Sequence, residues 1–397
     1  MARARLRTKL ITAILSPVLV FGVLEASLRI AGYRYVPDVS EGTEKARWLQ
    51  PTLYERHPVL RWTLIRNAVI DEPMVGFLRV ATNDMGLRGS QLPGGRRPRE
   101  VRVLCLGDSV TFGLGVRNGQ TWPKQLERVL LSSPELHGRP VHVLNGGVPG
   151  WSSVQGMRLF DRIRWYEPDF VVFWFGYNDV QAALGRPDAE TGTLDEVVAT
   201  LSHLRTVQLA ASAVDAIRGT GDDTTRASIE DFAAAVERLR ALEAGGGPQM
   251  VFVRYPERLD TTIAQLARVV ERAEAVGVEW VAGPGALLLP ITPAPDGADL
   301  VGRFVRGPQG PELRFGGSDE FRRSVATVRD DLEDVRAWRR GLAARRALLP
   351  GDSPGAEELF GSARPAEVFL DNCHLTPHGC RRAAQGIAAR ILSRLPR

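Results

Sequence analysis

Cysteine is scarce in this sequence, with 3 among 397 residues, and none of the three has the C-x-x-C spacing of zinc or dithiol sites. So few cysteines cannot brace a chain of this length, and burial of apolar side chains must hold the fold together. The sequence also lacks a repeat of about 20 to 50 residues, which excludes a solenoid. It has no P-loop and no H-E-x-x-H motif, so nothing indicates a cofactor or a metal ion.

An excess of one charge sign is also missing. Lys and Arg number 51 and Asp and Glu number 46, and the first nine residues supply four of the cations. The basic balance therefore gives no reason to expect a nucleic-acid partner. Hydrophobic residues make up 44% and charged residues 24% of the chain, which excludes a disordered chain and a collagen-like repeat. The length suits one large or two medium domains.

The amino terminus has the pattern of a membrane signal. Four cations precede an uncharged run from Leu10 to Leu24, which would form about 22 Å of helix. Continuing to Ile30 would give about 31 Å, close to the thickness of the hydrocarbon layer. Because Leu24-Glu25-Ala26 is a poor cleavage site, we interpret residues 1–32 as a transmembrane anchor, with a cleaved signal or a buried helix as alternatives. The preceding cations predict that the rest of the chain lies outside the cytoplasmic membrane.

Short apolar runs alternate with helical periods after residue 100. Residues 33–100 are predicted to form a strand-rich lead-in, and buried strands are predicted at 101–106, 141–144, 170–175, 250–253 and 278–281. Helices are predicted between them, with starting signals at Thr121, Ser228 and Asp260 and a last helix after Thr376. This order predicts an α/β fold, a three-layer α/β/α sandwich with a mainly parallel sheet, over residues 101–397. Two segments interrupt it, and we expect helical insertions near 190–227 and 296–362, with helices over 193–218 and 320–342.

A serine follows the first predicted strand, in Gly107-Asp108-Ser109. Ligands gather outside the carboxyl ends of parallel strands, so Ser109 is a candidate nucleophile, although Ser and Asp are also common at helix starts. A serine nucleophile needs a base, and the base needs an orienting acceptor. Of the six histidines, only His374 has a carboxylate at a suggestive local spacing, in Asp371-Asn372-Cys373-His374. We therefore expect Asp371 and His374 to act with Ser109.

Hydrogen-bond donors for an oxyanion are available after the next two strands. The second strand leads into Asn145-Gly146-Gly147-Val148-Pro149-Gly150, where glycine allows close approach of a backbone amide. The third leads into Gly176-Tyr177-Asn178-Asp179, whose Asn178 offers a side-chain amide. All these groups fall at one edge of one predicted sheet, which makes a shared site more plausible than four separate turns. Trp151 and Tyr177 can line a pocket there.

These residues together resemble the SGNH branch of the GDSL esterases and lipases. Gly-Asp-Ser, the glycine block, Gly-x-Asn-Asp and the late Asp-x-x-His occur in the family's order, over about 101–182 and 249–395. The resemblance implies a flavodoxin-like SGNH hydrolase fold and a serine esterase without a cofactor or metal. It implies that Ser109 is the nucleophile, His374 the base and Asp371 its orienter, and that Ser109, Gly150 and Asn178 supply the oxyanion donors.

The resemblance leaves several questions open. It implies a small acyl or acetyl ester as substrate, on a glycan or a lipid, but an O-acyltransferase that modifies an envelope glycan would use the same residues. An inactive envelope-binding module is a further alternative. The nucleophile elbow G-x-S-x-G of α/β-hydrolases is absent around Ser109. Cys373 and Cys380 would be able to form a disulfide outside the cytoplasm, if their Cα atoms come within reach.

Overall fold

Four parallel strands form the central sheet of the computed structural model. They are β7 (Val101–Gly107), β8 (Val141–Gly147), β9 (Phe170–Trp174) and β10 (Gln249–Phe252), in the order β10-β9-β7-β8. The predictions of strands at 101–106, 141–144, 170–175 and 250–253 are confirmed, and the one at 278–281 lies outside the described residues. The structure describes residues 2–38, 43–48, 53–72, 77–92, 95–181, 183, 187–190, 197–198, 200–218, 225–255, 303–307, 310–314, 336–370 and 373–395.

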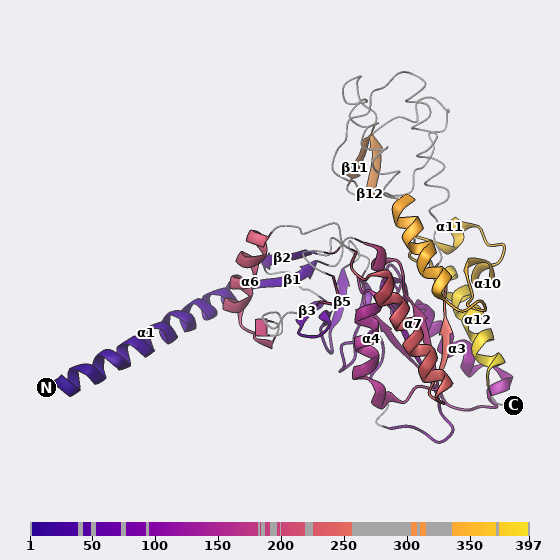
Figure 1. Ribbon diagram of the computed structural model, residues 1–397, viewed down its shortest axis with the longest axis horizontal. Coiled ribbons are helices and arrows are strands. Elements are labelled where there is room, and N and C mark those ends of the chain that lie inside the picture. The colour runs from indigo at the N-terminus through magenta and orange to yellow at the C-terminus, as the bar shows by residue number, and fades with distance from the viewer. Residues whose placement is uncertain are drawn as a thin grey trace.

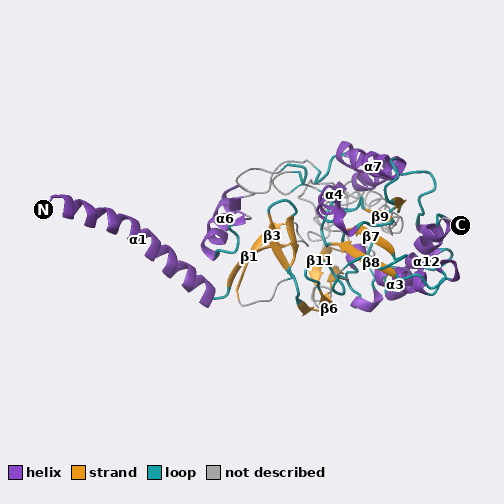
Figure 2. Ribbon diagram, turned by 90° about the horizontal axis from the view of Figure 1, so that it is seen from below, coloured by secondary structure: helices purple, strands orange, loops and turns teal. Residues whose placement is uncertain are grey.

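Both faces of the sheet are buried under helices. Along β7, Leu104 and Leu106 face one hydrophobic cluster, whereas Val103 and Cys105 face the other, as the alternation of side chains along a strand requires. Helices α4 (Ser153–Arg162) and α7 (Ile229–Ala244) cover the first face. Helices α3 (Trp122–Leu131) and α12 (Pro377–Ser393) cover the second (Figure 2). The expected α/β fold with a parallel sheet is therefore confirmed.

Side-chain caps begin three of these helices where the sequence predicts. The Thr121 hydroxyl accepts a hydrogen bond from the Lys124 amide, and the Thr376 hydroxyl accepts one from the Gly379 amide. Ser228 and Asp231 form a reciprocal capping box at the start of α7. Such local signals fix helix starts because they satisfy amides that have no partner within the helix. The shorter helices are α2 (Ser109–Phe112), α10 (Ala356–Phe360), α11 (Pro365–Val368), η2 (Asn118–Gln120), η3 (Pro134–Leu136), η4 (Arg164–Tyr166) and η5 (Asn178–Val180).

The described residues of the lead-in form three antiparallel strand pairs, of which the second and third along the chain share a core with the sheet. Leu53, Leu60, Leu64 and Val80 belong to the same hydrophobic cluster as the face covered by α4 and α7. The buried Arg88 guanidinium donates to the carbonyls of Phe112, Gly113 and Val116. The lead-in thereby packs directly against the segment that follows Ser109. The pairs are β1 (Tyr33–Asp38) with β2 (Thr43–Trp48), β3 (Tyr54–His57) with β4 (Arg61–Leu64), and β5 (Val69–Glu72) with β6 (Phe77–Ala81).

Helix α1 (Ala2–Ile30) extends away from the rest of the molecule (Figure 1). Its base contacts α6 (Arg205–Arg218), since the Thr206 amide donates to the Glu25 carboxylate over 2.9 Å. Within the described part of the chain, no helix has both the length and the apolar character needed to cross a membrane. The transmembrane helix expected over residues 1–32 is thus not found among the described residues.

The insertions differ in part from the sequence predictions. The helix expected over 193–218 is interrupted by a turn at residues 201–204 before α6 begins. Within the second insertion, β11 (Arg303–Gly307) and β12 (Gly310–Arg314) form an antiparallel pair that was not predicted from the sequence. Turn-forming residues at 307–311 favour a hairpin over a helix. The predicted helix over 320–342 is described only from residue 336 and continues to residue 348.

Gly147 is the last residue of β8, and α2 packs directly against it because glycine has no side chain. A Cβ atom there would overlap the backbone nitrogen of Phe112 and the carbonyl carbon of Thr111. We expect Gly147→Ala to lower the free energy of unfolding by about 3 kcal/mol, because a packed backbone cannot yield without distortion. Urea unfolding would measure this loss. Gly95→Ala is the control, since its Cβ would meet no atom within 4 Å, and equal stability of the two variants would contradict the prediction.

Candidate active site

Ser109 lies at the turn from β7 into α2. Asp108 caps this short helix, since its Oδ1 accepts a hydrogen bond from the Val110 amide over 2.9 Å. Its main-chain carbonyl accepts the Phe112 amide over 2.8 Å. Ser109 is only partly buried, whereas Asp108 is completely buried. The sequence folds in this way because Asp is a favoured N-cap residue and the preceding Gly107 has no side chain to oppose α2.

His374 meets Ser109 across 265 residues of sequence. The distance from His374 Nε2 to Ser109 Oγ is 2.8 Å, within hydrogen-bonding range for a nucleophile and its base. The His374 carbonyl accepts the Leu370 amide over 2.7 Å, and a bridge joins Phe369 to Leu375, so the loop before α12 is closed on itself. Asp371, the expected orienter, lies outside the described residues.

Asn178 connects the segments that carry the other two expected donors. It begins η5 after β9, and its Nδ2 donates to the Trp151 carbonyl over 3.0 Å and to Asp108 Oδ2 over 3.4 Å. These acceptors neighbour Gly150 and Ser109 in sequence. Gly150 adopts a φ of +77°, a conformation that glycine reaches without strain. Among the described residues, neither the Ser109 nor the Gly150 amide donates a hydrogen bond.

The buried carboxylates beside the site were not predicted to have roles there. Burial raises the pKa of Asp108 to about 7, against the hydrogen bond from the Val110 amide and the charge of His374, which lower it. Tyr255 O–H also donates to Asp108 Oδ1 over 3.2 Å. Burial raises the pKa of Asp179 as well, although the Ser153 amide and hydroxyl both donate to it. Tyr255 follows the end of β10, and this strand-exit position is the one signal that would have pointed to it.

Other candidate residues have structural surroundings. Trp151 is fully buried and does not line an open pocket, and its indole donates to the Trp62 carbonyl over 3.1 Å. Tyr177 packs edge-on against Trp338 with ring centroids 4.6 Å apart. No disulfide joins Cys373 to Cys380, and the Cys373 sulfur instead lies 3.8 Å from His374 Nδ1.

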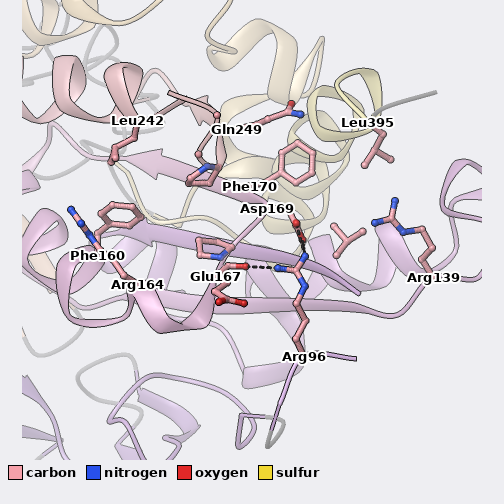
Figure 3. A pocket seen from close by; sticks show the side chains of 15 residues that line it. Arg96, Arg139, Phe160, Arg164, Glu167, Asp169, Phe170, Leu242, Gln249 and Leu395 are labelled. Carbon is pink, nitrogen blue, oxygen red and sulfur yellow. Dashed lines mark hydrogen bonds and ion pairs between the residues drawn. The ribbon is translucent and has the colours of Figure 1, made fainter. Parts of the chain in front are cut away.

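A separate cavity of about 580 Å³ opens at the opposite edge of the sheet (Figure 3). Val101, Phe170 and Gln249, the first residues of three parallel strands, line it. Arg96 reaches across it to the Asp169 carboxylate and the Glu167 carbonyl. Because Ser109 follows the other end of β7, this cavity is distinct from the site around Ser109.

Comparison with known proteins finds similarity to one family model and to several solved structures. The model of the GDSL-like lipase/acylhydrolase family matches residues 105–302. No curated protein matches the chain. An alpha/beta hydrolase enzyme from the metagenome of Lake Arreo, Spain, is 16% identical, with 74% of this chain and 96% of that chain covered and a TM-score of 0.33.

Two further solved structures are similar at the same level. An acetylxylan esterase from Geobacillus stearothermophilus, solved as a catalytic mutant, is 14% identical, with 73% of this chain and 94% of that chain covered and a TM-score of 0.29. A GDSL-like lipase from Bacteroides thetaiotaomicron is 13% identical, with 74% and 89% covered and a TM-score of 0.30.

The raised pKa of Asp108 predicts a pH-dependent stability. The folded protein holds a proton on Asp108 that the unfolded chain releases at its ordinary pKa of 3.8. Between about pH 4 and pH 7 the folded state therefore binds more protons, and stability falls as the pH rises through this window. Asp108→Asn removes this titration. The free energy of unfolding of the variant minus that of the wild type should therefore increase from pH 4 to pH 8.

Urea unfolding at several pH values would measure this difference. Asp84→Asn, which replaces an exposed carboxylate, is the control substitution. The comparison uses the change with pH, so the different hydrogen bonds of an asparagine at position 108 enter only as an offset. If Asp108→Asn changed the free energy of unfolding by the same amount at pH 4 and pH 8, the folded protein would not hold the proton on Asp108, and the prediction would be contradicted.

Proposed function

Because this chain belongs to the GDSL-like lipase/acylhydrolase family and is an ester hydrolase of the SGNH type, we propose that it cleaves small acyl esters through an acyl-enzyme formed on Ser109. The observation that carries this proposal is the 2.8 Å distance between Ser109 Oγ and His374 Nε2. Asp371 is proposed to hold the imidazole in the required tautomer, as its position three residues before His374 suggests.

The proposed reaction has two similar halves. His374 Nε2 accepts the Ser109 proton while Oγ bonds to the acyl carbon. The tetrahedral intermediate collapses as the bond from carbon to the alcohol oxygen breaks, and the alcohol leaves with the proton from His374. A water molecule then attacks the acyl-enzyme with His374 again as the base, which releases the carboxylic acid and restores Ser109.

The negative oxygen of each intermediate is proposed to bind the Ser109 amide, the Gly150 amide and Asn178 Nδ2. Asn178 suits this role because its contact to Asp108 Oδ2 is long, at 3.4 Å, so that hydrogen is weakly bound and can serve a stronger acceptor placed near it. Its other hydrogen stays on the Trp151 carbonyl and keeps the amide in place.

The exposed apolar side chains of α1 support a proposal on location. Leu15, Val18, Leu19, Val20, Phe21, Val23 and Leu24 are exposed. Four of them are consecutive, and consecutive residues point to all sides of a helix, so one docking face cannot cover them. We propose that this segment inserts into a lipid bilayer and keeps the hydrolase domain outside the cytoplasmic membrane.

The nucleophile assignment predicts that Ser109→Ala loses hydrolysis of p-nitrophenyl acetate. Asn178→Ala should lower kcat about 10²- to 10³-fold, the usual cost of one oxyanion donor, with little change in KM. Initial rates across acetyl to octanoyl esters would measure both effects and the preferred acyl length. Circular dichroism would verify that the variants are folded, and a fluorophosphonate probe should label the wild type but not Ser109→Ala. Full activity of Ser109→Ala would refute the assignment.

The membrane proposal predicts that the full chain floats with phospholipid vesicles in a density gradient. The double variant Leu19→Glu, Val20→Glu should remain at the bottom, because a charge inside the hydrocarbon region is costly. The double variant Leu131→Glu, Leu209→Glu, at exposed sites outside α1, is the control and should still float. Failure of the wild type to float would overturn this proposal without affecting the hydrolase assignment.

A further inference from the structure

The peptide unit between Pro149 and Gly150 carries one of the proposed oxyanion donors, and a residue of the lead-in holds it. The Trp62 indole N–H donates to the Pro149 carbonyl over 3.2 Å. In a trans peptide the carbonyl oxygen and the following N–H point in opposite directions. Holding the Pro149 oxygen therefore sets the direction of the Gly150 N–H. We propose that Trp62 is a positioning residue that aims the Gly150 amide at the oxyanion, an inference that rests on the proposed function.

The two following carbonyls are held in the same way. Arg226 Nη1 donates to the Gly150 carbonyl, and Asn178 Nδ2 donates to the Trp151 carbonyl over 3.0 Å. Three successive carbonyls are thus each bound by a side chain from a different segment of the chain. Rotation of one peptide unit in this loop would break a buried hydrogen bond and leave its donor without an acceptor. The carbonyl side of the loop is therefore held in place, and the Gly150 N–H points to the other side.

Trp62 is itself fixed by the residues around it. Its own carbonyl accepts the Trp151 indole N–H over 3.1 Å, so Trp62 is bound to the residues on both sides of Gly150, through its indole to Pro149 and through its carbonyl to Trp151. The Arg226 guanidinium lies 5.2 Å from the centre of the Trp62 ring. Arg226 pairs with the fully buried Asp188 over 2.7 Å, and Asp188 also pairs with Arg61, the neighbour of Trp62. The indole consequently has little freedom to leave the Pro149 carbonyl.

The Ser109 amide does not need such help. The carbonyl of its own peptide unit, that of Asp108, accepts the Phe112 amide within α2, so the helix orients the Ser109 N–H. Gly150 lies in a loop before α4, and no helix orients its peptide. Trp62 thus orients the Gly150 N–H, as α2 orients the Ser109 N–H. It does so from β4, which lies outside residues 105–302 that match the family model.

Trp62→Phe tests the proposal because it keeps an aromatic ring beside Arg226 and removes the indole donor. We expect kcat for p-nitrophenyl acetate to fall about tenfold, less than the 10²- to 10³-fold loss of a whole donor, while KM changes less than twofold. The inhibition constant of a trifluoromethyl ketone, which forms an oxyanion on the serine, should rise by the same factor. A merely structural role would not link these two quantities.

Trp151→Phe is the matched control. It removes another buried hydrogen bond from an indole N–H to a main-chain carbonyl, but the acceptor is the Trp62 carbonyl and not the 149–150 peptide. Its kcat should stay within about threefold of the wild type. Equal losses of kcat in the two variants, or an unchanged inhibition constant in Trp62→Phe, would overturn the positioning role.

Crystal structures of the wild type and Trp62→Phe test the proposal without any reaction. The Pro149 oxygen should rotate away from its wild-type direction in Trp62→Phe, and an unchanged 149–150 peptide would overturn the inference. If the wild type hydrolyses no ester, the proposed function fails, yet this comparison still decides whether Trp62 orients the peptide. If Trp62→Phe does not fold, a benzothienyl analogue of tryptophan at position 62, which replaces only the N–H by sulfur, serves in its place.

Discussion

The register of three parallel strands is the constraint on which the site depends. Gly107 of β7 pairs with Gly147 of β8 on one side and with Trp174 of β9 on the other. The three strands therefore end at one level, and Ser109, Gly150 and Asn178 follow these ends within a few residues. A shift of one residue in either pairing would turn the strand's side chains to the opposite faces, so the two hydrophobic clusters that stabilise the sheet also fix the level at which the site forms.

Buried carboxylates hold the loops that leave this edge. Asp108, Asp179 and Asp188 are fully buried, and each accepts hydrogen bonds from more than one segment. Burying ionised groups costs several kcal/mol each unless partners compensate, so these aspartates are poor sources of stability. They do restrict the loops to one arrangement, because any other arrangement would leave a buried carboxyl group without its hydrogen-bond partners. This restriction matters for the proposed site, because its oxyanion donors are single amide groups whose direction depends on the loop conformation.

The features that could be predicted from the sequence are those that depend on neighbouring residues. The strand runs and the caps at Thr121, Ser228 and Thr376 are read from neighbouring residues, and these predictions are confirmed. The pairing of Ser109 with His374 was expected from strand exits and loop position. The turn at residues 201–204 was missed because its residues also suit a helix surface. The contact between Trp62 and Pro149 spans 87 residues and leaves no periodic trace, so no local pattern could have shown it.

The segment from Leu53 to Arg88 therefore supports the proposed site and is not a separate unit. Its apolar side chains complete the cluster beneath α4 and β9, and Arg88 binds three carbonyls at and just beyond the end of α2. Without this segment, the Pro149 carbonyl would lose its donor and the Trp151 indole its acceptor, both in a buried place. The groups proposed for the chemistry lie after residue 107, whereas the direction of the Gly150 amide depends on residues that precede β7. The structural unit of this hydrolase therefore begins well before the strand that leads to its serine.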